Sequence, residues 1–178
     1  MKTKILIILT LLILTPSSSW ASELEFSAWL PYWKKNLAQE ETLKNLKTID
    51  ILLPFSYEVD KKGNIKDPMR LKVEPWPNIF SQARSVGVKI IPSILWNDGP
   101  AIETMLSTKK GRDAQVKQIV LLVKENNFAG IDIDYENKPA TVFRTFGAFI
   151  RSLSLELHKN GKILSCTIEP RLPPESRF

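Results

Sequence analysis

Three carboxylates recur at alternate positions in one short apolar segment. Asp132, Asp134 and Glu136 stand at i, i+2 and i+4, separated by Ile133 and Tyr135. In an extended strand such side chains share one face and lie about 6.5 to 7 Å apart per step. Three acids on one buried face are costly unless they share protons or hydrogen bonds, so one of them is expected to retain a proton near neutral pH. The pattern therefore predicts proton-transfer chemistry on a buried strand.

The same carboxylates admit two other interpretations. An Asp-x-Asp pair also suits Mg²⁺ or Mn²⁺, so a metal-dependent transferase using Asp132 and Asp134 stays open as an alternative. An exposed edge strand with solvated acids is the second, and the apolar flanks disfavour it. The chain has one histidine and one cysteine, His158 and Cys166, which excludes a disulfide framework and a paired-cysteine zinc site. No glycine-rich phosphate motif follows the first strand, which weakens nucleotide-binding versions of an open sheet. The leading interpretation accordingly needs no cofactor and assigns no metal-binding residue.

The elements that carry these acids alternate between strand-like and helix-like segments. Helical patterns are expected over residues 38–46 and 79–86, from a cap at Asp113 onward, and over 143–157. Residues 60–67 contain a turn sequence that predicts a small hairpin. Five short apolar runs predict strands, at residues 26–30, 49–55, 88–95, 130–135 and 163–168. Repeated β-α units predict an α/β fold with a parallel sheet and outer helices, either doubly wound or a barrel.

The acidic segment resembles a known family signature. Residues 128–136 read FAGIDIDYE and are similar to the DxxDxDxE motif on the fourth barrel strand of glycoside hydrolase family 18, the chitinase-like enzymes. Residues 26–33, 55–57 and 89–96 resemble the first, second and third strands of that family. The chain departs from the pattern at Ala129, where the motif begins with Asp, and at Ile94-Leu95, where a glycine pair is usual. The resemblance implies a partial TIM (β/α)8 barrel, comprising the first five β-strands with their helices, in a divergent and C-terminally truncated chain.

The resemblance also implies roles for individual residues. Glu136 would be the general acid that protonates the glycosidic oxygen. Asp134 would orient the 2-acetamido group of the substrate, whose oxygen is the nucleophile, and Asp132 would tune Asp134. Ser93 would hydrogen-bond the acids from the neighbouring strand. The expected substrate-binding residues near the strand ends are Tyr32, Trp33, Tyr57, Ser93, Trp96 and Tyr135.

The expected activity is hydrolysis of glycosidic bonds in N-acetylglucosamine-containing polysaccharide, of the chitin or peptidoglycan type, by a substrate-assisted retaining mechanism. An inactive remnant or a carbohydrate-binding module of the same family is the alternative. The partner of the protein would accordingly be an N-acetylated polysaccharide or oligosaccharide. Its net charge of +6 comes from scattered basic residues, which does not favour a nucleic-acid partner.

The N-terminal segment has the pattern of a secretory signal peptide. Lys2 and Lys4 precede an apolar run over residues 5–14, and Ala21 fits a small-residue cleavage position. We therefore expect a signal peptide over residues 1–21 and a truncated catalytic barrel over 22–178. An uncleaved anchor helix is the alternative, although the run is short for a membrane span. The sequence predicts a secreted or periplasmic protein with no stable membrane span after cleavage.

Overall fold

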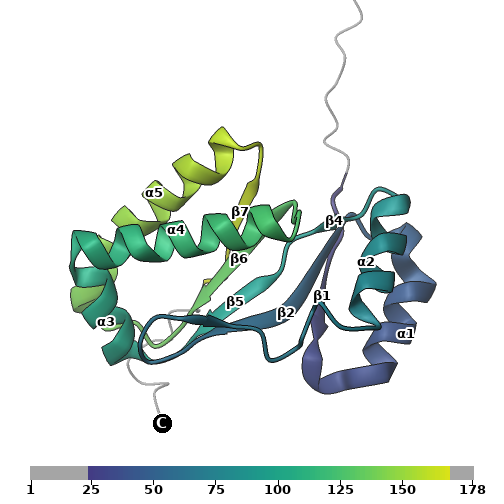
Figure 1. Ribbon diagram of the computed structural model, residues 1–178, viewed down its shortest axis with the longest axis horizontal. Coiled ribbons are helices and arrows are strands. Elements are labelled where there is room, and N and C mark those ends of the chain that lie inside the picture. Colours follow the sequence, from purple (N-terminus) through teal and green to yellow (C-terminus); the bar gives the residue numbers. More distant parts are fainter. Residues whose placement is uncertain (1–23, 169–178) are drawn as a thin grey trace, which may run out of the picture.

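A parallel β-sheet forms the centre of the molecule. The structure is a computed structural model, and it describes residues 24–168. The main strands are β1 (Ser27–Pro31), β2 (Ile51–Val59), β5 (Ser93–Trp96), β6 (Gly130–Tyr135) and β7 (Ile163–Cys166), and they neighbour one another in this order. The short strand β4 (Lys89–Ile90) also pairs with β2 in parallel. All five predicted runs form strands, although the run over residues 88–95 divides into β4 and β5. The described sheet is an unclosed arc of a barrel (Figure 1).

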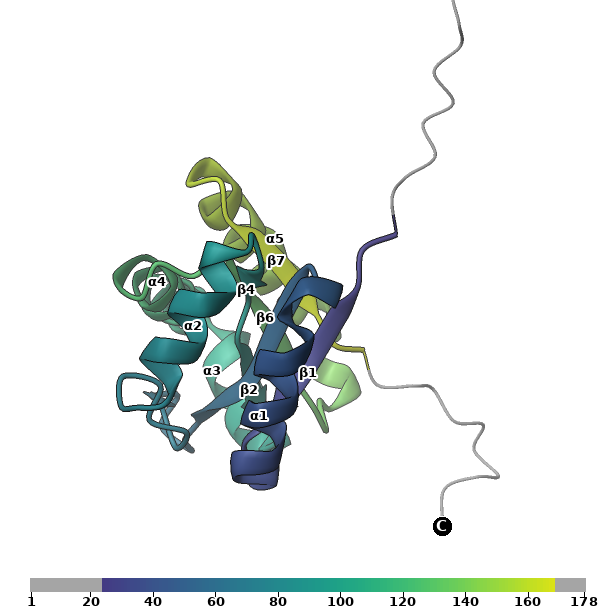
Figure 2. The ribbon, with the colours of Figure 1, turned by 90° about the vertical axis from the view of Figure 1, so that its right-hand side faces the viewer.

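Helices follow the strands as the predicted β-α alternation requires. They are α1 (Lys35–Asn45), α2 (Trp76–Ser85), α3 (Gly99–Ser107), α4 (Lys109–Glu125) and α5 (Phe143–Lys159). Short 3-10 turns occur at η1 (Tyr32–Lys34), η2 (Leu46–Thr48) and η3 (Ala140–Val142). Figure 2 shows α2 and α4 on the same side of the sheet. No helix within residues 24–168 is long and apolar enough to cross a membrane.

The prediction that Asp113 caps the third helix is wrong. Two helices occupy this region, and the side chain of Thr108 caps the second by accepting a hydrogen bond from Gly111 N at 3.0 Å. Asp98 caps the first, since its Oδ1 accepts from Ala101 N at 3.0 Å. The helix α3 was not predicted from the sequence. It begins at Gly99-Pro100, residue types that are typical of loops, although proline is well tolerated in the first helical turn.

The predicted hairpin is confirmed and helps to hold the sheet to a helix. Strand β3 (Ile65–Lys66) runs antiparallel to the end of β2. The Asp60 carboxylate accepts hydrogen bonds from Lys62 N at 2.9 Å and Asn64 N at 2.8 Å, and Gly63 takes a φ of +80° that favours glycine. Gln115 Nε2 of α4 donates to Gly63 O at 2.6 Å.

The two faces of the sheet have different surroundings. The main core lies between the sheet and the helices, and Ile131 and Ile133 of β6 belong to it. A second, small cluster of Ile51, Leu53 and Ile91 lies on the other face, which we call the inner face. Because strand side chains alternate, this division places Asp132 and Asp134 on the inner face.

Candidate active site

Strand β6 positions the acidic side chains. All six of its residues are buried, and the exposed fractions of Asp132 and Asp134 are 1% and 3%. In the pairing with β5, Asp132 stands opposite Ser93 and Asp134 opposite Leu95. Glu136 comes directly after the strand and is partly exposed, and its backbone N donates to Trp96 O at 2.8 Å. The acids therefore run from the buried interior to the C-terminal mouth of the sheet, where sites of barrel enzymes lie.

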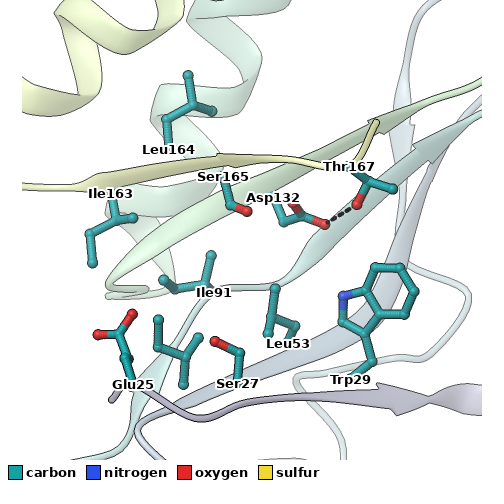
Figure 3. Close-up of a pocket in the computed structure, with 11 residues that line it drawn as sticks. Glu25, Ser27, Trp29, Leu53, Ile91, Asp132, Ile163, Leu164, Ser165 and Thr167 are labelled. Atoms are coloured by element: carbon teal, nitrogen blue, oxygen red, sulfur yellow. Dashed lines mark hydrogen bonds between the residues drawn. The ribbon is translucent and has the colours of Figure 1, made fainter. Parts of the chain in front are cut away.

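The Asp132 carboxylate is fixed from both neighbouring strands. Ser93 Oγ donates a hydrogen bond to Asp132 Oδ2 at 2.8 Å, so the predicted contact between Ser93 and the acids is confirmed. Thr167 Oγ1, just past β7, donates to the same oxygen at 3.2 Å (Figure 3). Hydrogen bonds of this kind offset the cost of burying a carboxylate. Thr167 was missed by sequence reasoning, although its alternation from Ile163 along the strand places it on the inner face.

The inner face forms a cavity of about 630 Å³ between the two edges of the sheet. Ser27 and Trp29 border it from β1, and Ser165 and Thr167 border it from the β7 side (Figure 3). Asp132 lies at this cavity, between polar and apolar side chains. The lining combines a carboxylate and hydroxyl groups with an aromatic ring, so it offers both polar and apolar contacts to a small-molecule ligand.

Aromatic rings from β1, β2 and η1 gather together, and one of them, Trp29, borders the inner-face cavity. The Trp33 and Phe55 rings meet edge to face with centroids 5.6 Å apart, and Trp29 lies 6.2 Å from Phe55. Trp29 and Trp33 are each 56% exposed. Of these three rings, only Trp33 was predicted from the sequence to bind substrate. Phe55 lies near it because Phe55 pairs with Pro31, two residues before Trp33. The backbone of Tyr32 begins η1 directly after β1, and its side chain lies outside the described part of the chain.

Three predicted substrate-binding residues lie on the other face of the sheet. Tyr57, Trp96 and Tyr135 are buried in the core between sheet and helices. The Tyr135 ring stacks on Phe149 at 5.7 Å, and burial raises the pKa of its hydroxyl. Burial, together with the charge of Asp67, also raises the pKa of Tyr57. The expectation that these rings contact sugar is corrected. Alternation along β5 and β6 turns Trp96 and Tyr135 toward the helices, and an irregularity in β2 between Phe55 and Tyr57 turns Tyr57 the same way.

The metal-dependent alternative gains no support from the arrangement of side chains. Within residues 24–168, no three His, Cys, Asp or Glu side chains are grouped so that they could hold a metal ion.

Lys138, two residues after Glu136, lies over the Phe146 ring at 5.2 Å and donates a short hydrogen bond to Tyr135 O. This contact places a positive charge next to the acidic strand.

Comparison with known proteins identifies the family. Residues 28–174 match the family model described as glycosyl hydrolases family 18. The chain belongs to this family. The comparison with curated proteins found no match. The predicted resemblance is therefore confirmed over most of the chain.

Solved structures of family 18 proteins share the fold. A class V chitininase from Pseudomonas fluorescens Pf-5 is 25% identical, with a TM-score of 0.71, and the match covers 86% of this chain and 48% of that one. The spore cortex-lytic enzyme SleL from Bacillus megaterium QM B1551 is 23% identical, with a TM-score of 0.71, over 86% and 36% of the two chains. A catalytic domain of the Ostrinia furnacalis Group II chitinase, in complex with (NAG)5, is 17% identical, with a TM-score of 0.66, over 81% and 43%. This family 18 chain thus spans less than half the length of these three structures.

Proposed function

We propose that this chain hydrolyses glycosidic bonds in N-acetylglucosamine-containing polysaccharide, with Glu136 as the general acid. The observation that carries the proposal is the placement of the three acids: Asp132 and Asp134 are buried on β6, and Glu136 directly follows it at the mouth of the sheet. Family membership supports the reaction type. The names of the similar structures, which include chitinases and a spore cortex-lytic enzyme, support chitin or peptidoglycan as the substrate class.

The proposed mechanism is substrate-assisted and retains the anomeric configuration. Glu136 protonates the glycosidic oxygen while the acetamido oxygen of the same sugar attacks the anomeric carbon. Asp134 orients the acetamido group and stabilises the positive charge that forms on its ring. Asp132, held by Ser93 and Thr167, fixes the charge state of Asp134. The three acids lie along one strand, so all of them approach the sugar from one side, which suits a nucleophile supplied by the substrate.

The second candidate function is carbohydrate binding without turnover. Two observations favour it: Trp29 and Trp33 are exposed, and the described sheet is unclosed. An open sheet supplies aromatic surface for a sugar, while Glu136 at its mouth is partly exposed to water. Exclusion of water strengthens electrostatic stabilisation of a transition state, so its loss affects catalysis more than binding.

Two substrates distinguish these functions. The purified chain is incubated with an N-acetylglucosamine oligomer and with the matching deacetylated glucosamine oligomer, and proton NMR follows the first products. The proposal predicts cleavage of the acetylated oligomer alone, with the β-anomer released first. Cleavage of both oligomers at similar rates would contradict the acetamido nucleophile. Binding of the acetylated oligomer without cleavage would support the carbohydrate-binding alternative.

We also propose that the protein is secreted or periplasmic, through a signal peptide over residues 1–21 and a catalytic domain over 22–178. The N-terminal segment lies outside the described residues, so the proposal rests on its sequence pattern. N-terminal sequencing of the protein expressed in a bacterial host tests it. A start at Ser22 in the exported fraction is expected, and an intact Met1 in membrane-bound protein would favour the uncleaved anchor.

A further inference from the structure

Thr167 occupies a fixed position beside the acidic strand. It comes directly after β7, and its backbone N donates to Ile133 O of β6 at 3.0 Å. This bond extends the β6–β7 pairing by one step, so the threonine backbone is held by the strand that carries the acids. The side chain is partly buried and borders the inner-face cavity. Thr167 is therefore placed by backbone contacts, and its hydroxyl is directed at β6.

The hydroxyl of Thr167 and that of Ser93 converge on one oxygen. Both donate to Asp132 Oδ2, at 3.2 Å and 2.8 Å, from strands on opposite sides of β6. A carboxylate oxygen has two lone pairs, so these two donors use its acceptor capacity. Neither hydroxyl contacts the other oxygen, Oδ1. The two hydroxyls thereby fix the orientation of the carboxylate.

The segment before Asp132 supplies no comparable donor. Ala129, three residues earlier, packs against the apolar cluster of Ile51, Leu53 and Ile91 on the inner face. Its methyl group cannot donate a hydrogen bond to Asp132. The flanking strands are therefore the source of the side-chain hydrogen bonds that the structure gives to this carboxylate.

From this geometry we propose that Thr167 is a positioning residue, which acts in the proposed hydrolysis by orienting Asp132. The inference rests on the proposed function for its kinetic consequences, while the orientation itself is independent of turnover. Removing the hydroxyl in Thr167→Val keeps the shape of the side chain and frees one lone pair of Oδ2. Thr167→Ser restores the donor without the methyl group.

The first measurement does not require the chain to hydrolyse sugar. The ¹³Cγ resonance of Asp132 is recorded in the full chain labelled at aspartate, and it is assigned by its loss in Asp132→Asn. We expect the resonance to shift in Thr167→Val and to return toward the original position in Thr167→Ser. The matched control Thr104→Val, on the exposed surface of α3, should leave it unchanged. An unchanged Asp132 resonance in Thr167→Val would overturn the proposal whether or not the chain hydrolyses sugar.

The second measurement is kinetic and uses an N-acetylglucosamine oligomer. Hydrogen bonds to charged groups are worth enough that Thr167→Val should lower kcat about tenfold, with KM changed about twofold or less. Thr167→Ser should recover most of kcat, and Thr104→Val should match the unaltered chain. A shifted resonance with kcat unchanged in Thr167→Val would overturn the positioning role. If the unaltered chain has no turnover, the proposed function fails, and the resonance alone decides whether Thr167 orients Asp132.

Discussion

Trp96 and Tyr135 contact each other edge to face, with ring centroids 5.3 Å apart, on the opposite side of the sheet from the acids. They stand opposite each other in the pairing of β5 with β6. Trp96 directly follows Leu95, and Tyr135 directly follows Asp134; Leu95 and Asp134 both lie on the inner face. The pair therefore shows how one strand step separates a residue that packs the core from one that borders the site.

A first prediction separates packing from sugar binding. Because Trp96 is 1% exposed, Trp96→Phe should lower the free energy of unfolding by about 1 to 3 kcal/mol through lost packing. Binding of an N-acetylglucosamine oligomer should be unchanged in the folded variant. Urea unfolding and isothermal calorimetry measure the two quantities. Weaker sugar binding at unchanged stability would contradict the placement of Trp96 in the core.

The exposed ring of Trp33 predicts the opposite result. Trp33→Ala should change the free energy of unfolding by about 1 kcal/mol or less, because the ring is 56% exposed and meets Phe55 edge to face. Oligosaccharide binding should weaken several-fold, since a stacking surface is removed. Urea unfolding and isothermal calorimetry again measure the two quantities, and the results are compared with those for Trp96→Phe. Undiminished binding in Trp33→Ala would exclude this ring from the sugar site.

Cys166 reports the charge of Asp132. Burial and the nearby negative charge of Asp132 raise the pKa of the thiol to about 11, although the residue as a whole is exposed and Lys138 acts in the opposite direction. Alkylation by iodoacetamide at pH 8 should therefore be slow, because the thiolate is the nucleophile. Asp132→Asn should speed the reaction. Equal rates in the two proteins would show that Asp132 carries no charge felt at Cys166.

The hairpin turn predicts a titration at low pH. Hydrogen bonds from the backbone and side chain of Asn64 lower the pKa of Asp60 to about 2. Because the folded pKa lies below the unfolded value of about 3.9, this stabilisation is fully present above that value and is lost as the pH falls through about 2. In Asn64→Ala, the Asp60 midpoint followed by NMR should rise. A midpoint near 3.9 in the unaltered chain would contradict the turn geometry.

The sequence predicted the strands, and the shared face of Asp132 and Asp134, more accurately than the positions of the aromatic residues. Residues 130–135 form β6 as expected, because a run of alternating Ile and Asp bounded by Gly has few other stable conformations. Tyr57 and Trp96 were assigned to sugar because they lie near strand ends. Which face they occupy depends on register, and β2 is irregular between Phe55 and Tyr57, so alternation from Ile51 places Tyr57 incorrectly.

Helix boundaries and tertiary hydrogen bonds were the other sources of error. The break between α3 and α4 depends on the caps at Asp98 and Thr108, and local periodicity does not reveal it. Thr167 and Asp132 are 35 positions apart in the sequence, so their contact depends on the pairing of β6 with β7. The resemblance to family 18 supplied the order of the strands, and the structure supplied which side chains meet.

The most direct test of the account compares Glu136→Gln with the unaltered chain. Gln keeps the shape of the side chain and cannot deliver the proton, so hydrolysis of an N-acetylglucosamine oligomer should fall by about 10² to 10⁴-fold. Oligosaccharide binding and the free energy of unfolding should be retained. Glu125→Gln, on the exposed end of α4, is the matched control and should hydrolyse normally. Hydrolysis by Glu136→Gln at the rate of the unaltered chain would contradict the central claim that Glu136 is the general acid.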